Sequence, residues 1–274
     1  MTAAVLSKLT VAGVGLICKS FFNLGFCSVQ VNRLDILLDA LDNSDRNNGK
    51  GVVTVSNHIS TLDDPLTWGI LPSRCYFSSR TTRWALGASE VMFTNPIFST
   101  FFRLGQTLET FRGQGIYQES VNTAISKLDQ GAWVHLFGEG KVNQPSAYPV
   151  DCEGLAHLPR FKWGIGRIVS ESIHQPVVIP MWLAGYENLM PEGRTFPYKY
   201  LPRPGACLSV TFGDPIPATE LSAAIEAQAP SPIVASPLKV PLGDAQRSKL
   251  TALIHSHVER LGRGAYGKTL SLPP

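Results

Sequence analysis

Four short apolar segments rich in β-branched or aromatic residues constrain the fold of this chain more than any other feature. They cover residues 52–55, 132–137, 177–182 and 207–212. Such segments are typical of strands in the buried core of a sheet. Helical patterns lie between them, at residues 116–128 and 165–174. Strands that alternate with helices predict an α/β fold in which a central mixed sheet is flanked by helices.

The length of 274 residues is enough for one generous core and does not require two domains. We expect a membrane-associating segment at residues 1–34, a main domain at 35–220 and a C-terminal part at 221–274 that packs on it. Pro, Ala and Ser dominate residues 227–241, which predicts a surface insertion. Residues 243–262 return to a helical period and predict a closing helix.

The composition excludes several classes of function. Hydrophobic residues make up 44% of the chain and charged residues 16%, so part of the apolar surface is expected to meet lipid. The net charge of +3 is small and dispersed, which argues against nucleic-acid binding. The five cysteines form no Cys-x-x-Cys pair and the histidines show no metal-ligand spacing. We therefore expect neither a disulfide framework nor a metal site.

Residues 1–34 contain three basic residues and no acidic one. Their apolar stretches, 11–18 and 21–29, are separated by Lys19 and Ser20, so the segment is a poor bilayer span and fits an interfacial membrane helix better. Two alternatives stay open. The composition would also suit a transit peptide, although arginine enrichment and an obvious cleavage site are missing. The segment could also be an ordinary helix packed on the domain.

The residues that follow the predicted strand at 52–55 can carry chemistry. His58 leaves the strand end, and Asp63 follows five positions later. If the Asp63 carboxylate accepts one imidazole N–H of His58, the other ring nitrogen becomes a general base. No Gly-x-Ser-x-Gly turn supplies a serine nucleophile. The nucleophile would then be a hydroxyl of the acceptor substrate, attacking an acyl carbonyl. Alone, the pattern is common and also fits a capping Asp beside an unrelated His.

Two neighbours have supporting roles in this interpretation. Asn57 is expected to hold the turn and the orientation of His58 by side-chain hydrogen bonds. Asp64 precedes Pro65 and is expected to cap the following helix. His135 alternates with apolar residues on its strand, which favours a core or supporting histidine over a catalytic one.

The surrounding motifs resemble a known family. Blocks in the order and spacing of the four motifs of the glycerolipid acyltransferase superfamily lie at residues 57–63, 111–112, 137–141 and 178–181. Within that superfamily, residues 50–215 resemble the tafazzin family. The most specific motifs are Glu-Gly-Lys-Val-Asn at 139–143 and Phe-Lys-Trp-Gly-Ile-Gly-Arg at 161–167. The resemblance implies a glycerolipid acyltransferase-like fold.

The resemblance also implies an activity. Tafazzins are coenzyme-A-independent transacylases, without a cofactor, that move fatty acyl chains between phospholipids and lysophospholipids. The implied substrates are cardiolipin, monolysocardiolipin and phosphatidylcholine. The implied location is the surface of a mitochondrial inner or outer membrane, facing the intermembrane space, with monotopic attachment. Protein partners are not implied. An acyl-coenzyme-A-dependent lysophospholipid or glycerol-phosphate acyltransferase, or a catalytically silent membrane scaffold, are the alternatives with the same fold.

Four residues are expected to bind substrate. Arg112 lies before a glycine-rich loop, where its guanidinium could clamp a phosphate, although a surface salt bridge is the alternative. The resemblance assigns Glu139 and Gly140 to acceptor binding or site geometry. Lys141 is expected to meet a lipid phosphate, unless it is an ordinary exposed lysine.

The chain departs from the family pattern at Gly138, where the superfamily usually has proline. We expect glycine to loosen the turn that presents Glu139. Residues 144–159 are expected to form a surface loop. Two further apolar segments, 93–104 and 165–184, are candidate membrane contacts or buried elements.

Overall fold

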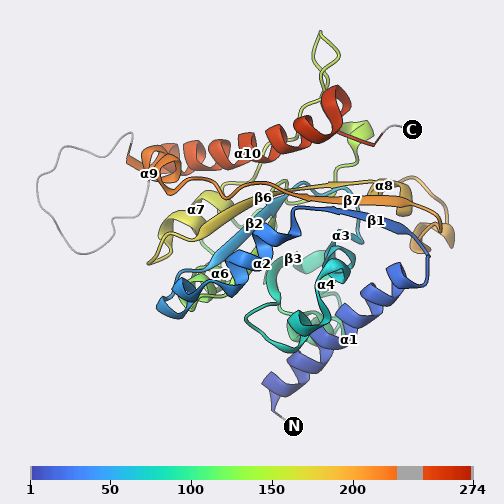
Figure 1. Ribbon diagram of the computed structural model, residues 1–274, viewed down its shortest axis with the longest axis horizontal. Coiled ribbons are helices and arrows are strands. Elements are labelled where there is room, and N and C mark those ends of the chain that lie inside the picture. Colours follow the sequence, from blue (N-terminus) through green and yellow to red (C-terminus); the bar gives the residue numbers. More distant parts are fainter. Residues whose placement is uncertain (1, 227–242, 273–274) are drawn as a thin grey trace, which may run out of the picture.

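Seven strands form one sheet at the centre of the computed structural model, which describes residues 2–226 and 243–272 (Figure 1). They are β1 (Ser28–Asn32), β2 (Val52–Ser56), β3 (Arg83–Ala88), β4 (Thr107–Thr110), β5 (Trp133–Phe137), β6 (Val177–Ala184) and β7 (Cys207–Phe212). The strand order is β1-β7-β6-β2-β5-β3-β4, and every neighbouring pair is parallel except β6 and β7. The predicted mixed sheet is confirmed. The insertion predicted at 227–241 lies outside the described residues.

Three strands were not predicted from the sequence. β3 begins with Arg83 and is interrupted by Gly87, so its apolar run is short, and β4 has only four residues. β1 pairs with β7 at one edge of the sheet. β1 lies within residues 1–34, the segment expected to associate with the membrane, yet it belongs to the sheet of the main domain. A domain boundary at residue 34 would therefore cut this edge strand from its sheet.

The helices lie on both sides of the sheet. They are α1 (Ala3–Asn23), α2 (Leu34–Asp42), α3 (Asp63–Leu66), α4 (Ser89–Met92), α5 (Pro96–Leu104), α6 (Glu119–Asp129), α7 (Gly164–Glu171), α8 (Tyr186–Leu189), α9 (Ala218–Glu226) and α10 (Asp244–Tyr266). In Figure 1, α10 runs along one side of the sheet and α1 lies on the opposite side. The helical spans predicted near 116–128, 165–174 and 243–262 correspond to α6, α7 and α10.

Helix α1 continues through Lys19 and Ser20, the polar residues that separate its two apolar stretches. It has 21 residues and a mean hydropathy of 1.5 over its most apolar window, of which 17% is buried. By length and composition alone it could cross a membrane. Lysine is a good helix former, and the ammonium group of Lys19 donates to the carbonyl of Leu71, 2.9 Å away. Ala12, Gly15 and Cys18 form the buried stripe of α1.

The two other candidate membrane contacts behave differently. Residues 165–184 are a buried element rather than a membrane contact. Ile165 and Ile168 of α7 are buried, and β6 is buried at nearly every position. Residues 93–104 include α5, which has no buried residue. The latter segment therefore keeps the larger exposed apolar surface, with Ile97, Phe98 and Phe101, whereas Ile173 is the one large apolar residue exposed in 165–184.

Helix α10 packs against the sheet through a close glycine contact. A Cβ atom added to Gly262 would lie 2.4 Å from the ring of Trp182, which is fully buried in β6. Two residues further along the helix, Gly264 has no atom within 4 Å of such a Cβ. Packing therefore requires glycine at position 262, whereas at position 264 only the intrinsic cost of glycine in a helix applies.

We predict that Gly262→Ala destabilises the protein by about 1 to 3 kcal/mol, because the Trp182 ring cannot move aside in a packed core. The matched control Gly264→Ala is expected to stabilise α10 by up to about 1 kcal/mol, because alanine favours the helix and meets no neighbour. Urea unfolding of the two variants measures both effects. Equal effects of the same sign would contradict the close contact.

Candidate active site

The candidate site lies at the carboxyl ends of the parallel strands. His58 follows β2, Arg112 follows β4 and Glu139 follows β5. Because β2, β5, β3 and β4 are parallel, these residues emerge at the same edge of the sheet. In open α/β sheets this edge is where ligands bind.

His58 and Asp63 form the hydrogen bond that the sequence predicted. Nδ1 of His58 lies 2.8 Å from Oδ2 of Asp63. The same oxygen accepts the backbone N–H groups of Ile59 at 2.7 Å and Ser60 at 2.9 Å. Asp63 is fully buried, whereas the His58 side chain is 20% exposed. The carboxylate is therefore held inside the protein while the imidazole reaches the surface.

This geometry suits the general-base role that the sequence predicts for His58. When the Nδ1–H of His58 donates to Asp63, the lone pair lies on Nε2, where it can accept a proton from a substrate. The imidazole also stacks on Phe137, with ring centroids 4.2 Å apart. Burial raises the pKa of Asp63, and the hydrogen bonds from His58, Ser60 and Ile59 act in the opposite direction.

Glu139 holds the main chain of His58. One carboxylate oxygen accepts the backbone N–H of His58 at 2.8 Å, and the other accepts the side-chain amide of Asn143. The backbone N–H of Asn143 in turn donates to the carbonyl of His58 at 2.7 Å. Both carboxylate oxygens of Glu139 are therefore occupied by protein groups, and the structure gives this residue a positioning role.

Comparisons with known proteins show the family to which this chain belongs. A protein-family model described as acyltransferase matches residues 38–184. A protein of Dictyostelium discoideum named taffazin is 37% identical over 215 residues, which cover 77% of this chain and 70% of that protein. This chain belongs to the tafazzin-like acyltransferases.

Two further comparisons set the limits of that assignment. The N-acylphosphatidylethanolamine synthase of Arabidopsis thaliana is 38% identical over 187 residues, which cover 68% of this chain and 62% of that protein. The crystal structure of the 1-acyl-sn-glycerophosphate acyltransferase PlsC from Thermotoga maritima superposes with a TM-score of 0.56 at 17% identity, covering 93% of this chain and 80% of that one. The latter similarity shows that the chain has a PlsC-like acyltransferase fold.

The tafazzin-like chain does not have the loosened turn that Gly138 was expected to cause. The backbone N–H of Gly138 donates to the carbonyl of Ser56 at 3.0 Å, a bond that proline could not form. A Cβ atom at Gly138 would lie 2.4 Å from the ring of Phe161. Next to the Glu139 side chain, Gly140 has φ of +70°, which glycine adopts without strain. The turn is fixed by backbone pairing and by packing.

Asn57 joins the site to the neighbouring strand β6. Its side-chain amide donates to the carbonyl of Leu183 at 2.9 Å, and its side-chain oxygen accepts the backbone N–H of Leu183 at 2.8 Å. This two-way pairing anchors the residue directly before His58.

The helix-capping role predicted for Asp64 is wrong. Asp64 has the extended backbone angles that an N-cap residue adopts, but its carboxylate binds side chains rather than the backbone N–H groups of the following turn. The carboxylate instead accepts the indole N–H of Trp68 at 3.0 Å and Nε–H of Arg83 at 2.9 Å. Asp64 and Arg83 form an ion pair in which each side chain is 11% exposed. This partner comes from β3, a strand that was not predicted.

Of the two remaining predicted residues, Arg112 lies apart from this cluster, whereas Lys141 follows Glu139 closely and its charge acts on the Glu139 carboxyl. Arg112 forms an ion pair with Glu90 at 3.0 Å, and both side chains are about half exposed. Lys141 is exposed. By strand order, β4 lies three strands from β2, a separation of about 14 Å at the usual strand spacing.

Some buried polar residues near the site could not be predicted from the sequence. The loop at 144–159 was expected on the surface, but Gln144 and Tyr148 are buried. The Gln144 side-chain amide donates to the carbonyl of Met190 at 2.9 Å, and its oxygen accepts the backbone N–H of Glu192. Their polarity and the nearby prolines gave no sequence signal of burial. Asn143 lay inside a recognised motif, yet its bond to Glu139 could not be read from spacing.

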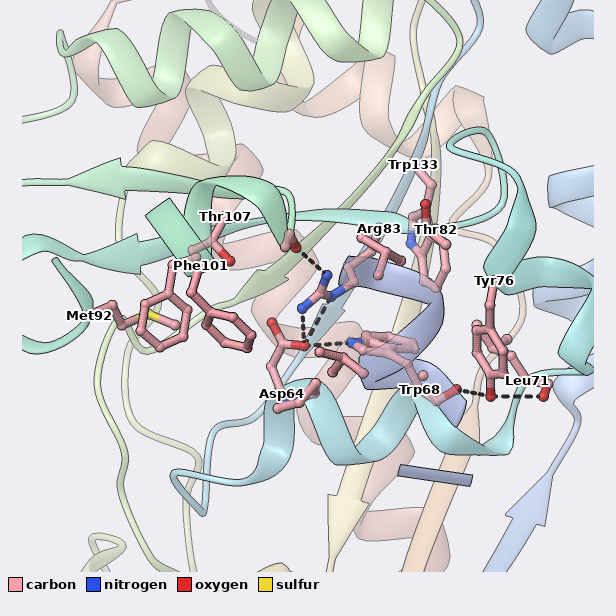
Figure 2. Close-up of a pocket in the computed structure, with 16 residues that line it drawn as sticks. Asp64, Trp68, Leu71, Tyr76, Thr82, Arg83, Met92, Phe101, Thr107 and Trp133 are labelled. Carbon is pink, nitrogen blue, oxygen red and sulfur yellow. Dashed lines mark hydrogen bonds and ion pairs between the residues drawn. The ribbon is translucent and has the colours of Figure 1, made fainter. Parts of the chain in front are cut away.

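A cavity lies beside the site, between α1, α5 and the turn that carries Asp64 (Figure 2). Its lining is apolar apart from a few groups: Val11, Val14, Gly15, Asp64, Pro65, Trp68, Leu71, Tyr76, Thr82, Arg83, Met92, Phe101, Phe102, Gly105, Thr107 and Trp133. Figure 2 shows the Arg83 guanidinium and the Trp68 indole both directed at Asp64. The charges at this wall therefore neutralise one another.

We predict that Glu139 makes stability depend on pH. Burial raises the pKa of Glu139 to about 8, from a usual value of 4.5. The unfolded chain loses this proton first, so the contribution of Glu139 to stability falls as pH rises from about 4.5 to about 8. Glu139→Gln lacks this titration. The thermal midpoint of the variant minus that of the wild type should therefore increase as pH rises from about 4.5 to about 8. The exposed Glu153→Gln serves as the control. Parallel curves for wild type and Glu139→Gln would contradict the prediction.

Proposed function

We propose that this tafazzin-like acyltransferase transfers fatty acyl chains from phospholipids to lysophospholipids without coenzyme A. The observation that carries the proposal is the oriented base. His58 is aligned by the buried Asp63 in a chain that is 37% identical to a protein named taffazin. A base of this kind activates a hydroxyl that the acceptor lipid itself provides.

The reaction is one acyl exchange. Nε2 of His58 takes the proton of the acceptor hydroxyl as that oxygen attacks the acyl carbonyl of the donor lipid. The tetrahedral intermediate collapses by breaking the bond between the acyl carbon and the donor glycerol oxygen. His58 then returns the proton to that oxygen, which leaves as the hydroxyl of a lysophospholipid. Asp63 stabilises the imidazolium between the two proton transfers.

The finer assignments rest on the same relatives. We propose monolysocardiolipin as an acceptor, phosphatidylcholine as a donor and a mitochondrial membrane facing the intermembrane space as the location. The similarity to the protein named taffazin supports the lipid class, and the apolar helix α1 supports membrane attachment. Arg112 and Lys141 are proposed to meet lipid phosphates, because both are exposed cations on loops that follow parallel strands.

The cavity beside α1 is proposed to hold an acyl chain. Its walls are mostly apolar and include Asp64, the residue next to Asp63. A chain lying there is proposed to extend its carbonyl end toward His58. The buried ion pair of Asp64 with Arg83 leaves no unpaired charge against the chain.

A second candidate function is N-acylation of phosphatidylethanolamine. It is favoured by the 38% identity to the N-acylphosphatidylethanolamine synthase. The same base could take a proton from an attacking amine. The two functions differ in the acceptor atom, and the product, ester or amide, distinguishes them.

We predict that purified protein moves labelled acyl chains from phosphatidylcholine to monolysocardiolipin without coenzyme A. His58→Ala should reduce the rate by about 100-fold or more, because the general base is lost. Glu153→Gln, at an exposed residue, is the control and should retain the rate.

Separate reactions test the alternatives. Transfer that needs acyl-coenzyme A would select the coenzyme-A-dependent reaction, and an amide product with phosphatidylethanolamine would select N-acylation. Transfer by His58→Ala at the wild-type rate would refute the assigned base. A wild-type protein that is inactive with all of these substrates would support the silent scaffold.

We predict that filling the cavity changes selectivity for chain length. Val14 lines the cavity from α1, so Val14→Trp should slow transfer of long acyl chains about tenfold more than that of short ones. Leu9→Trp is the control, because Leu9 lies on the same helix and is exposed without lining the cavity. Competition between donors of two chain lengths measures the ratio. An unchanged ratio would place the acyl chain elsewhere.

A further inference from the structure

Helix α5 presents apolar side chains to solvent. None of its nine residues is buried. Ile97 is 78% exposed, Phe98 51% and Phe101 45%. The helix begins at a capped end, where the side-chain oxygen of Asn95 accepts the backbone N–H of Phe98 at 2.9 Å. A well-formed helix that exposes three large apolar residues marks an interaction surface.

This surface lies next to α1. The hydroxyl of Ser7 in α1 donates to the carbonyl of Leu104 at the end of α5, 2.7 Å away. Helix α1 exposes apolar residues of its own, with Leu9 at 57% and Ile17 at 70%. The helix pair therefore carries apolar surface on both members.

The charges near this surface suit a phospholipid bilayer. Neither α1 nor α5 contains an aspartate or a glutamate. Lys8 of α1 is an exposed cation, and Arg103 of α5 is also exposed although its guanidinium forms an ion pair with Glu109 at 2.6 Å. Amphipathic helices that lie in a bilayer interface combine an apolar face with basic residues, which attract anionic lipid headgroups.

We propose that α5 is a second membrane contact, in which Ile97, Phe98 and Phe101 enter the interface of a phospholipid bilayer beside α1. The proposal rests on the proposed function and deepens it, because it assigns the surface through which an enzyme with lipid substrates meets them. A second copy of this chain is the competing occupant of the same surface.

The cavity extends from this surface to the turn at Asp64, the residue next to Asp63. Its lining includes Val14 of α1, Phe101 and Phe102 of α5, and Asp64 and Pro65. Phe101 is both exposed and part of the lining, so the cavity reaches the apolar surface. Docking through both helices would let an acyl chain pass from the bilayer into the cavity without crossing water.

The test places a fluorescent reporter on α5. Full-length Phe98→Trp is mixed with vesicles of phosphatidylcholine and an anionic phospholipid, whose acyl chains are unlabelled or brominated. Bromine should quench the variant more than the wild type, because the added indole lies among the acyl chains. Ile173→Trp is the matched control, since Ile173 is 66% exposed on a segment outside α1 and α5 and should add no quenching. Quenching of Phe98→Trp no greater than that of the control would overturn the proposal.

A charge substitution gives a second, independent measurement. The double variant Ile97→Glu and Phe98→Glu should lower the vesicle partition coefficient at least about tenfold, because two apolar side chains are lost from the interface. Ile173→Glu should leave it unchanged. If instead the wild type is a dimer and the double variant is a monomer that binds vesicles normally, a second copy covers α5 and the proposal fails.

The same variants separate this proposal from the proposed function. Ile97 and Phe98 do not line the cavity, so the double variant should transfer acyl chains at the wild-type rate when the lipids are dissolved in detergent micelles. Normal micellar transfer without added quenching would overturn the membrane contact alone. Added quenching with a wild-type protein that transfers no acyl chain would overturn the proposed function alone.

Discussion

The site depends on the burial of one carboxylate. Asp63 is fully buried, and a single oxygen accepts N–H groups from the His58 ring and from the backbones of Ile59 and Ser60. A buried charge is tolerated only where such donors replace water. The loop between β2 and α3 must therefore close around Asp63, and the orientation of His58 follows from that closure. Folding of the loop and alignment of the base are the same event.

Strand pairing extends this constraint to a second loop. Ser56 at the end of β2 pairs with Phe137 at the end of β5, so the two following loops start side by side. Glu139 and Asn143 of the second loop bind the backbone N–H and carbonyl of His58. A shift in the register of β2 against β5 would separate these groups. The parallel sheet thus sets the position of the base, whereas Asp63 sets its orientation.

Local patterns explain what could be predicted from the sequence. The continuous apolar run of β2 and the five-residue spacing of His58 and Asp63 are local, and both predictions agree with the structure. The contact of Gly138 with Phe161 joins residues far apart in the chain, so the missing proline suggested a looser turn than the structure has. β3 was missed because only three apolar residues lie between Arg83 at its start and Gly87, and with it the partner of Asp64 was missed.

Asp63 and Asp64 have identical side chains, but their different surroundings give them different roles. Asp63 meets N–H donors and an imidazole that can exchange its proton, so its charge supports proton transfer. Asp64 meets Arg83, whose guanidinium stays charged, so its carboxylate serves to neutralise that cation at the wall of an apolar cavity. Removing Asp64 would leave a nearly buried cation where an acyl chain is proposed to lie. The doubled aspartate therefore gives the turn one carboxylate for the base and one for the cavity.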